Sequence, residues 1–307
     1  MRYRGRGTGR AARTLAVASV MVLLAGLAAC APAASVKQTC DPTDRDHWAI
    51  AYTKLKNSYV KGVYWLVGGK PRPINNDKVI QAQTPSLSPD GRRVYFEGFY
   101  GKGGKYSNKM VLADTDGTHL KVFGEGISTP VWSPDGTRVA YRDTDTDADT
   151  IVMADPDNGH RHRIATDAAT DPAWSADGTK LAWTSTGGTT FHWKSVDGGG
   201  EGSVDVVSGD LLTQAWLPDG KSVAVSLVVG DDIDLYLVSL SGKGKPRFLA
   251  KNVGAPSTLP DGTIGALDVA HPDADVSDYV SVDPKTGKRE NVAKIQGDDV
   301  SVIACYP

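Results

Sequence analysis

Short apolar runs separated by turn residues recur along most of the chain. Within residues 131–141, an apolar run meets Ser-Pro-Asp-Gly, and a run rich in β-branched and aromatic residues follows. Proline presets φ for a turn, aspartate bonds back to the backbone and glycine accepts a positive φ, so this pattern predicts a β-hairpin. Two further runs, at 150–154 and 161–165, flank a second turn and predict a third and a fourth strand.

The hairpin turn returns at a nearly constant spacing. Its glycines, Gly91, Gly136, Gly178, Gly220 and Gly262, are 45, 42, 42 and 42 residues apart. Four short antiparallel strands in about 42 residues form one blade of a β-propeller. The aspartates of these turns, Asp90, Asp135, Asp177, Asp219 and Asp261, are expected to shape the turn and not to act as catalytic acids.

Counting the repeats predicts a closed ring. Five complete blades are expected at 85–123, 130–165, 172–207, 215–250 and 256–295. The remaining pieces are strands at 47–53 and 63–67, a strand after Pro71, and a single strand at 300–305. Joining these pieces completes a sixth blade and removes the open sheet edges. The expected fold class is therefore all-β: a six-bladed β-propeller of four-stranded antiparallel blades over residues 47–307, closed by the C-terminal strand.

One apolar position also follows the repeat. Trp132, Trp174 and Trp216 occupy it in the central repeats, whereas Leu87 and Thr258 fill it in the outer ones. An aromatic side chain that recurs at the repeat period is expected to pack between blades, so this position needs no functional explanation.

The N-terminal 29 residues have a different pattern. They carry five arginines and no acidic residue, and an apolar run at 15–27 follows the arginines, which is typical of a secretory signal peptide. The run ends in Leu-Ala-Ala-Cys and resembles a bacterial lipobox. The resemblance implies a mature chain that begins at Cys30 with a diacylglycerol thioether (and palmitate), followed by a tether at 30–46. An ordinary signal peptide with a chance cysteine is the alternative.

Removing that segment changes the charge balance. The chain has 34 basic and 36 acidic residues, so the mature part has 29 basic against 36 acidic residues, a difference of −7. Nucleic-acid-binding proteins carry basic faces, so this balance argues against such a partner and against electrostatic adhesion to anionic lipid.

Two cysteines remain in the mature chain, one near each end. Closure of the ring would bring Cys40 and Cys305 to the same seam. Outside the cytoplasm two thiols are more often paired than free, so we predict a disulfide that fastens the ring, with two free thiols as the alternative.

The repeats support a family resemblance. The form Trp-Ser-Pro-Asp-Gly, followed by a third strand such as Ile-Val-Met-Ala-Asp, resembles the repeat of TolB-type β-propellers over about residues 47–305. The resemblance implies a six-bladed periplasmic protein that binds partners at one mouth of the ring. Two features differ from TolB. Only some 16 residues lie between Cys30 and the first predicted strand, which leaves no room for the α/β domain that precedes the propeller in TolB. TolB is also not lipidated, whereas this chain carries a lipobox-like sequence. The resemblance therefore implies the fold and not the Tol–Pal role.

Acidic residues gather in the expected connections between the second and third strands of three blades. They are Asp143, Asp145, Asp147, Asp149, Asp231, Asp232, Asp234, Asp273, Asp275 and Asp278. Propeller topology would place them on one rim, where they could attract a basic partner, hold Ca²⁺ or serve solubility alone. The cluster lacks the turn glycine and terminal glutamate of an EF-hand loop. His160 and His162 could share one face of a strand and hold a metal, or form an exposed outer strand.

Two functions are consistent with these features. The first is a lipid-anchored extracytoplasmic lipoprotein, expected to be a monomer, whose propeller binds an envelope protein or another ligand. The sequence has no G-x-S-x-G, His-Glu-x-x-His or Cys-x-x-Cys motif, so we expect no enzyme and no cofactor. The alternative is an envelope enzyme of the lactonase or hydrolase type with a metal in the central channel. Its ligands would come from loops that lead into the inner strands, which contain Glu125, Asp167, Asp171, Asp210, Asp298 and Asp299.

Overall fold

The computed structural model describes the chain from residue 49 to residue 303, with gaps. The described ranges are 49–56, 59–67, 70–74, 81–102, 105–123, 126–145, 148–185, 187–188, 190–205, 211–241, 245–259, 261–270, 277–295 and 300–303. All regular structure in these ranges is β-strand. Among the same residues, no helix is long and apolar enough to cross a membrane.

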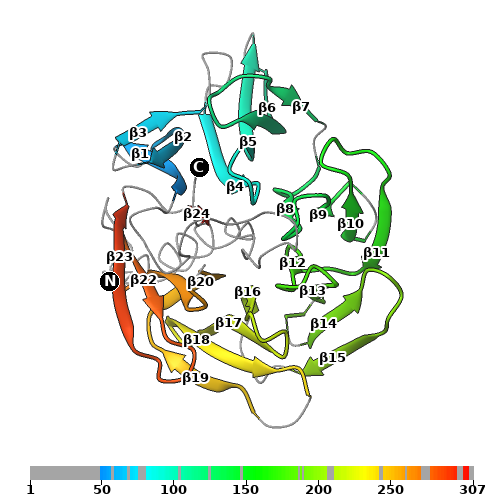
Figure 1. Cartoon of the computed structure of the whole chain (residues 1–307), viewed down its shortest axis with the longest axis vertical. Coiled ribbons are helices and arrows are strands. Elements are labelled where there is room, and N and C mark those ends of the chain that lie inside the picture. The colour runs from blue at the N-terminus through cyan, green and yellow to red at the C-terminus, as the bar shows by residue number, and fades with distance from the viewer. Residues whose placement is uncertain are drawn as a thin grey trace, which may run out of the picture.

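The strands form six four-stranded antiparallel sheets arranged as blades around a ring (Figure 1). One blade consists of β4 (Gln81–Leu87), β5 (Arg93–Lys102), β6 (Lys105–Asp114) and β7 (Lys121–Val122). The second along the chain consists of β8 (Val131–Trp132), β9 (Val139–Asp143), β10 (Thr150–Ala154) and β11 (His162–Thr166). The third consists of β12 (Ala173–Trp174), β13 (Lys180–Thr184), β14 (Thr190–Ser195) and β15 (Glu201–Asp205). The next two are β16 (Leu211–Trp216), β17 (Ser222–Val229), β18 (Asp232–Ser239) and β19 (Arg247–Ala250); and β20 (Val253–Thr258), β21 (Ile264–Asp268), β22 (Ser277–Val282) and β23 (Arg289–Ile295). The predicted all-β propeller of four-stranded blades is confirmed.

The remaining sheet joins the two ends of the described chain. It consists of β24 (Val300–Ile303), β1 (Ala49–Lys56), β2 (Tyr59–Val67) and β3 (Lys70–Pro73), in that order. Strand β24 runs antiparallel to β1, with Ile303 opposite Ala49 and Val300 opposite Tyr52. The predicted closure of the ring is therefore confirmed. The signal segment, Cys30, Cys40 and Cys305 lie outside the described residues, so the lipid anchor and the disulfide stay predictions.

The repeated turn between the first two strands of a blade is built by side-chain bonds to the backbone. The Ser133 hydroxyl donates to Asp135 Oδ1 at 2.6 Å and accepts from the Arg138 N–H at 2.9 Å. Gly136 has a φ of 70°, in the left-handed region that favours glycine. The turns at Ser88 and Ser175 repeat these bonds. This confirms the prediction that the repeated aspartates shape the turns.

The aspartate of this turn couples folding to pH. Partial burial raises the pKa of Asp135, but hydrogen bonds from Ser133 and Thr137 outweigh it, so the net pKa lies below its usual value. An aspartate whose pKa is lower in the folded than in the unfolded state stabilises the fold, and this contribution is complete at pH values above the unfolded-state pKa of about 3.9. The contribution is lost as the pH falls through the folded-state pKa.

Replacing Asp135 by alanine is expected to lower the free energy of unfolding by about 1 kcal/mol at pH 7, because the carboxylate is exposed and its hydrogen bonds are partly screened by solvent. Urea unfolding at pH 7 and pH 3 measures this loss of unfolding free energy, which should be smaller at pH 3. D231A is the matched control, because Asp231 is an exposed turn aspartate without a hydrogen bond to a described residue. An equal loss in both variants would contradict the role of the turn bonds.

The tryptophans of the repeat lie between neighbouring blades, as predicted. Trp132 is fully buried, and its indole Nε1–H donates to the Ser86 carbonyl of the preceding blade at 3.0 Å. Trp174 and Trp216 make the same kind of bond, at 3.1 and 3.2 Å, to carbonyls of the inner strands before them. The packing was predictable from the period, whereas these indole–carbonyl bonds between blades were not.

Candidate functional site

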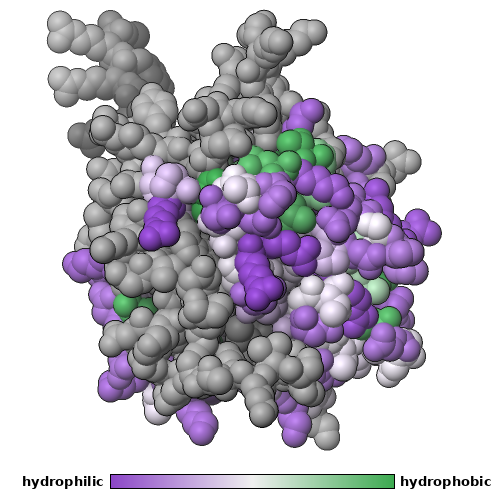
Figure 2. Space-filling view, turned by 45° about the horizontal axis from the view of Figure 1, so that its top comes forward, coloured by the Kyte–Doolittle hydropathy of each residue, from purple (hydrophilic) through white to green (hydrophobic). Residues whose placement is uncertain are grey.

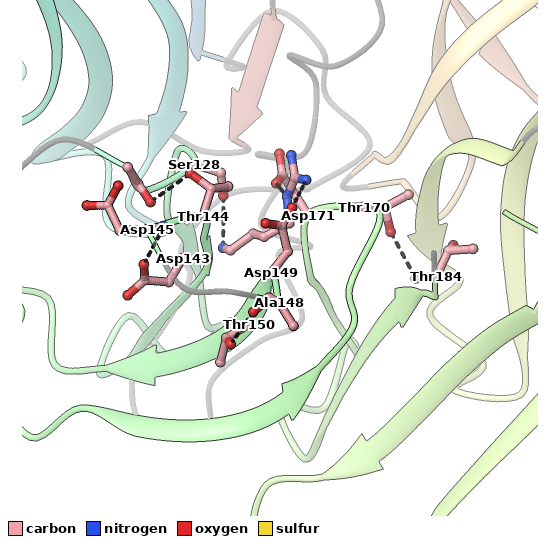
Figure 3. A network of polar contacts seen from close by, with 12 residues as sticks. Ser128, Asp143, Thr144, Asp145, Ala148, Asp149, Thr150, Thr170, Asp171 and Thr184 are labelled. Carbon is pink, nitrogen blue, oxygen red and sulfur yellow. Dashed lines mark hydrogen bonds and ion pairs between the residues drawn. The ribbon is translucent and has the colours of Figure 1, made fainter. Parts of the chain in front are cut away.

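The candidate site is the face of the ring that carries the connections between second and third strands. Arg142, near the end of β9, lies on this face. Its Nη1 contacts Asp149 Oδ2 at 2.7 Å, and its Nε donates to Asp171 Oδ1 at 3.1 Å. Asp149 comes from the connection between β9 and β10, whereas Asp171 comes from the segment before β12 of the next blade (Figure 3). One arginine therefore ties two blades together at this face.

Asp171 is the more deeply buried of the two acids that contact Arg142. Its side chain is 9% exposed, and this burial raises its pKa above the usual value, although Arg142 and the Ser128 hydroxyl act in the opposite direction. Its backbone carbonyl accepts a hydrogen bond at 2.7 Å from Gln214 Nε2 of β16. The network thus joins three consecutive blades, and it fixes the orientation of Arg142. The remaining nitrogen of that guanidinium, Nη2, makes no hydrogen bond to a described residue.

A second arginine neutralises part of the predicted acidic rim. Asp143 is mostly buried and accepts a hydrogen bond from Arg161 Nη2 at 2.6 Å. Its other oxygen accepts from the Asp145 N–H at 3.2 Å, which folds the connection back on the strand end (Figure 3). The guanidinium of Arg161 also lies over the ring of Tyr141, 5.7 Å from its centroid. Asp145 is exposed, and Asp147 lies outside the described residues.

The acids of the β16–β19 blade differ from the prediction. The connection between β17 and β18 is a tight turn of Gly230 and Asp231, so Asp232 and Asp234 lie on β18 and not in the connection. Asp232 pairs with Lys251 at 2.8 Å, and the buried Asp234 accepts from the Asn252 N–H at 3.2 Å. Asp231 is exposed and has no ion pair with a described residue. Only this aspartate fits the predicted rim in its blade.

The other candidate ligands are also dispersed. Asp278 lies on β22, 3.8 Å from Lys294, and Asp167 is exposed. His160 Nδ1 contacts Asp155 Oδ2 at 2.5 Å, whereas His162 is exposed on β11. Among the described residues, no group of three or more His, Cys, Asp or Glu side chains could hold a metal ion. Six further candidates lie outside that part of the chain: Glu125, Asp210, Asp273, Asp275, Asp298 and Asp299.

The described surface is polar. Large apolar side chains are exposed at three described positions, Val122, Val229 and Phe248. In the view of Figure 2, the described residues are mostly hydrophilic, with a limited apolar area. A partner of this surface would meet hydrogen-bonding groups and charges more than apolar side chains.

The repeat pattern did not single out Arg142. The same place in the other four repeats is occupied by Glu97, Thr184, Ser226 and Asp268. The position varies between repeats, so its pattern carries no signal for an arginine that links two blades. Sequence reasoning noted Asp171 only as a possible metal ligand, and the structure gives it an arginine partner instead.

The comparisons with known proteins agree on the fold. No protein-family profile matches the chain. It is 30% identical over 92 residues to the Tol-Pal system protein TolB of Methylococcus capsulatus, which covers 29% of this chain and 22% of that protein. The crystal structure of TolB from Acinetobacter baumannii superposes with a TM-score of 0.65 at 17% identity, over 84% of this chain and 66% of that one. The fold is a TolB-like β-propeller.

The match has limits that matter for function. The similar segment spans about a fifth of TolB, 22% of its length. An oligogalacturonate lyase in complex with manganese also superposes, with a TM-score of 0.50 at 14% identity, over 80% of this chain and 72% of that one. Likeness at this level concerns the TolB-like fold alone, and one propeller fold carries many functions.

Proposed function

We propose that this protein is an extracytoplasmic lipoprotein, held to a membrane through Cys30, whose TolB-like propeller binds a protein or peptide partner of the cell envelope. The lipobox-like sequence before Cys30 supports the anchor. The similarity to a Tol-Pal system protein supports an envelope role and a protein partner. The partner docks on the face that contains Arg142.

The network of Arg142 is the observation that carries this proposal. It joins three blades into one rigid surface and leaves a guanidinium nitrogen without a hydrogen bond to a described residue. A fixed donor on a rigid surface loses little conformational entropy when it binds a partner carbonyl or carboxylate. We therefore propose binding, and not catalysis, as the role of this face.

The unpaired acids add a preference for the partner. Asp145 and Asp231 are exposed on this face and have no ion pair with a described residue. The mature chain also has more acidic than basic residues. Complementary charge speeds association and excludes wrong partners, so we propose a partner with a basic contact surface. The protein itself acts as a monomer, and nucleic acid is not its ligand.

Crosslinking in intact cells, followed by capture of the full chain and mass spectrometry, tests the binding role. A single recurrent envelope protein is expected with the wild type. The double variant D145N/D231N should capture about three- to tenfold less of it, because two exposed charges are removed. The control is D157N/D197N, which removes two exposed acids from turns between third and fourth strands, on the opposite face, where they pair with Lys121 and Arg138.

Equal capture by both double variants would contradict the proposed face. Absence of a recurrent partner, together with a stoichiometric metal in the purified full chain, would support the enzyme alternative. A Cys30→Ala variant tests the anchor separately: it should leave the membrane fraction, whereas retention there would contradict lipidation at Cys30.

A further inference from the structure

A groove of about 460 Å³ lies against the blade formed by β8–β11. The outer side is lined by Arg161, Arg163 and Thr166, and the inner side by Asp143, Thr150 and Val152. It lies on the face of this sheet, because its lining residues come from β9, β10 and β11, and it shares Asp143 with the site described above. Its chemistry is basic on the outer side and partly apolar at the floor, where Val152 is buried.

The two arginines reach the groove together because of strand geometry. Residues two apart on a strand point to the same side and are separated by about 6.5–7 Å. Arg161 directly precedes β11 and Arg163 lies on it, so the two side chains line one wall. This spacing is a fixed property of the backbone, so a ligand with charges at the same interval matches both groups.

The two guanidinium groups differ in the contacts that they make with the protein. Arg161 is held at 2.6 Å by Asp143 and lies over the ring of Tyr141, which fixes its position and neutralises its charge. The Arg163 side chain is exposed and makes no hydrogen bond, ion pair or ring contact with a described residue. The groove therefore holds one positioned donor and one cation that pairs with no described acid. Guanidinium groups bind carboxylates through two parallel hydrogen bonds, which favours a carboxylate ligand.

The sheet order adds an edge to this recognition surface. Strand β11 is the outermost strand of its sheet, so its outer backbone edge pairs with no strand of that sheet, although the Ile164 carbonyl accepts a hydrogen bond from Lys194 Nζ of β14 at 3.4 Å. An extended peptide can add to such an edge, and its alternate side chains then lie opposite those of the edge strand. Carboxylates at alternate positions of that peptide would face Arg161 and Arg163.

We propose that this groove binds an extended acidic peptide segment of a protein partner, with carboxylates two residues apart. The inference goes beyond the binding role of the Arg142 face, because it concerns a groove on the face of one blade that extends to its outermost strand, and a partner segment of opposite charge. The spacing of the arginines, the groove and the edge strand support it together.

Fluorescence anisotropy with the full chain tests the proposal. The probe is a labelled hexapeptide with glutamate at its second and fourth positions and threonine elsewhere, and its counterpart carries glutamine instead. Binding to R163Q is expected to be about tenfold weaker than to the wild type, because a charge-assisted bidentate contact is lost. R163K should show a loss of about threefold, since the charge remains without the planar fork. R92Q is the matched control: Arg92 is exposed on another blade, and its removal changes net charge equally.

The outcomes separate the proposal from simpler explanations. Equal losses in R163Q and R92Q would overturn it, because they would show an effect of net charge alone. Equal binding of the glutamine peptide, or full displacement by acetate or inorganic phosphate at the peptide concentration, would also overturn it. Since the assay uses purified protein and a synthetic peptide, its result does not depend on the partner captured in cells. Retention of the R163Q unfolding midpoint verifies that the variant is folded.

Discussion

Trp132→Ala is expected to lower the free energy of unfolding by about 4–5 kcal/mol, the largest effect of any substitution considered for this propeller. The side chain is fully buried, 5.2 Å from the ring of Tyr95, and the guanidinium of Arg93 lies over it at 4.8 Å. Truncation leaves a cavity between two blades and removes the donor to the Ser86 carbonyl. Urea unfolding of wild type and variant measures the difference in unfolding free energy. The transition is monitored by circular dichroism of the backbone, so that the signal does not depend on the missing tryptophan.

Trp132→Phe separates the two contributions. Phenylalanine keeps most of the ring but has no indole N–H, so a loss of about 1–2 kcal/mol is expected. If the phenylalanine and alanine variants lost the same amount, packing between blades would not be the main role of this side chain. An unchanged stability of the alanine variant would contradict the whole account of the repeat position.

Arg142→Met is expected to lower the free energy of unfolding by about 3 kcal/mol at pH 7, because it leaves the Asp171 carboxylate buried without its cation. The loss depends on pH. Without the arginine, the pKa of Asp171 rises further above its unfolded value, and an acid with a raised folded-state pKa is most destabilising above that pKa. The deficit should therefore shrink as pH falls through the raised value. Urea unfolding between pH 4 and pH 8 measures it.

A second substitution tests the assignment of that loss. The double variant R142M/D171N removes the buried charge together with its partner and should recover more than half of the loss. Lys121→Met is the comparison at an exposed pair: Lys121 and Asp157 are 51% and 69% exposed, so its removal should cost about 1 kcal/mol or less. Losses of equal size at Arg142 and Lys121, or no recovery in the double variant, would contradict the view that burial of Asp171 sets the effect.

The sequence predicted those parts of the fold that are encoded within a few residues. The turn at Ser133–Gly136 is complete in itself, since its hydroxyl, carboxylate and glycine bond to neighbouring backbone. Five such turns at a constant spacing define the blades, and the unpaired strands at 47–53 and 300–305 predicted the closure. Among the described residues these strands are found at Ala49–Lys56 and Val300–Ile303 and pair with each other.

The candidate site was less predictable because its contacts cross between blades. Arg142 and Asp171 are 29 residues apart and meet only after two blades pack. The acidic cluster was recognised in the sequence, but the arginines that pair with it were not. The order of charged residues along the chain does not show which side chains from different strands lie on the same face of a blade. For Asp232 and Asp234, the error came from the length of a hairpin: the glycine at 230 permits a two-residue turn, so the strand begins earlier than expected.

The pairing of β24 with β1 also has a consequence for biosynthesis. Ala49 and Ile303 are 254 residues apart, so their contact is among the last that a chain made from its N-terminus can form. Until the final strand emerges, β1 presents an unpaired edge while every other blade is already complete. Pairing with β24 is therefore the step that removes this edge and with it the exposure of β1 to wrong strand pairing.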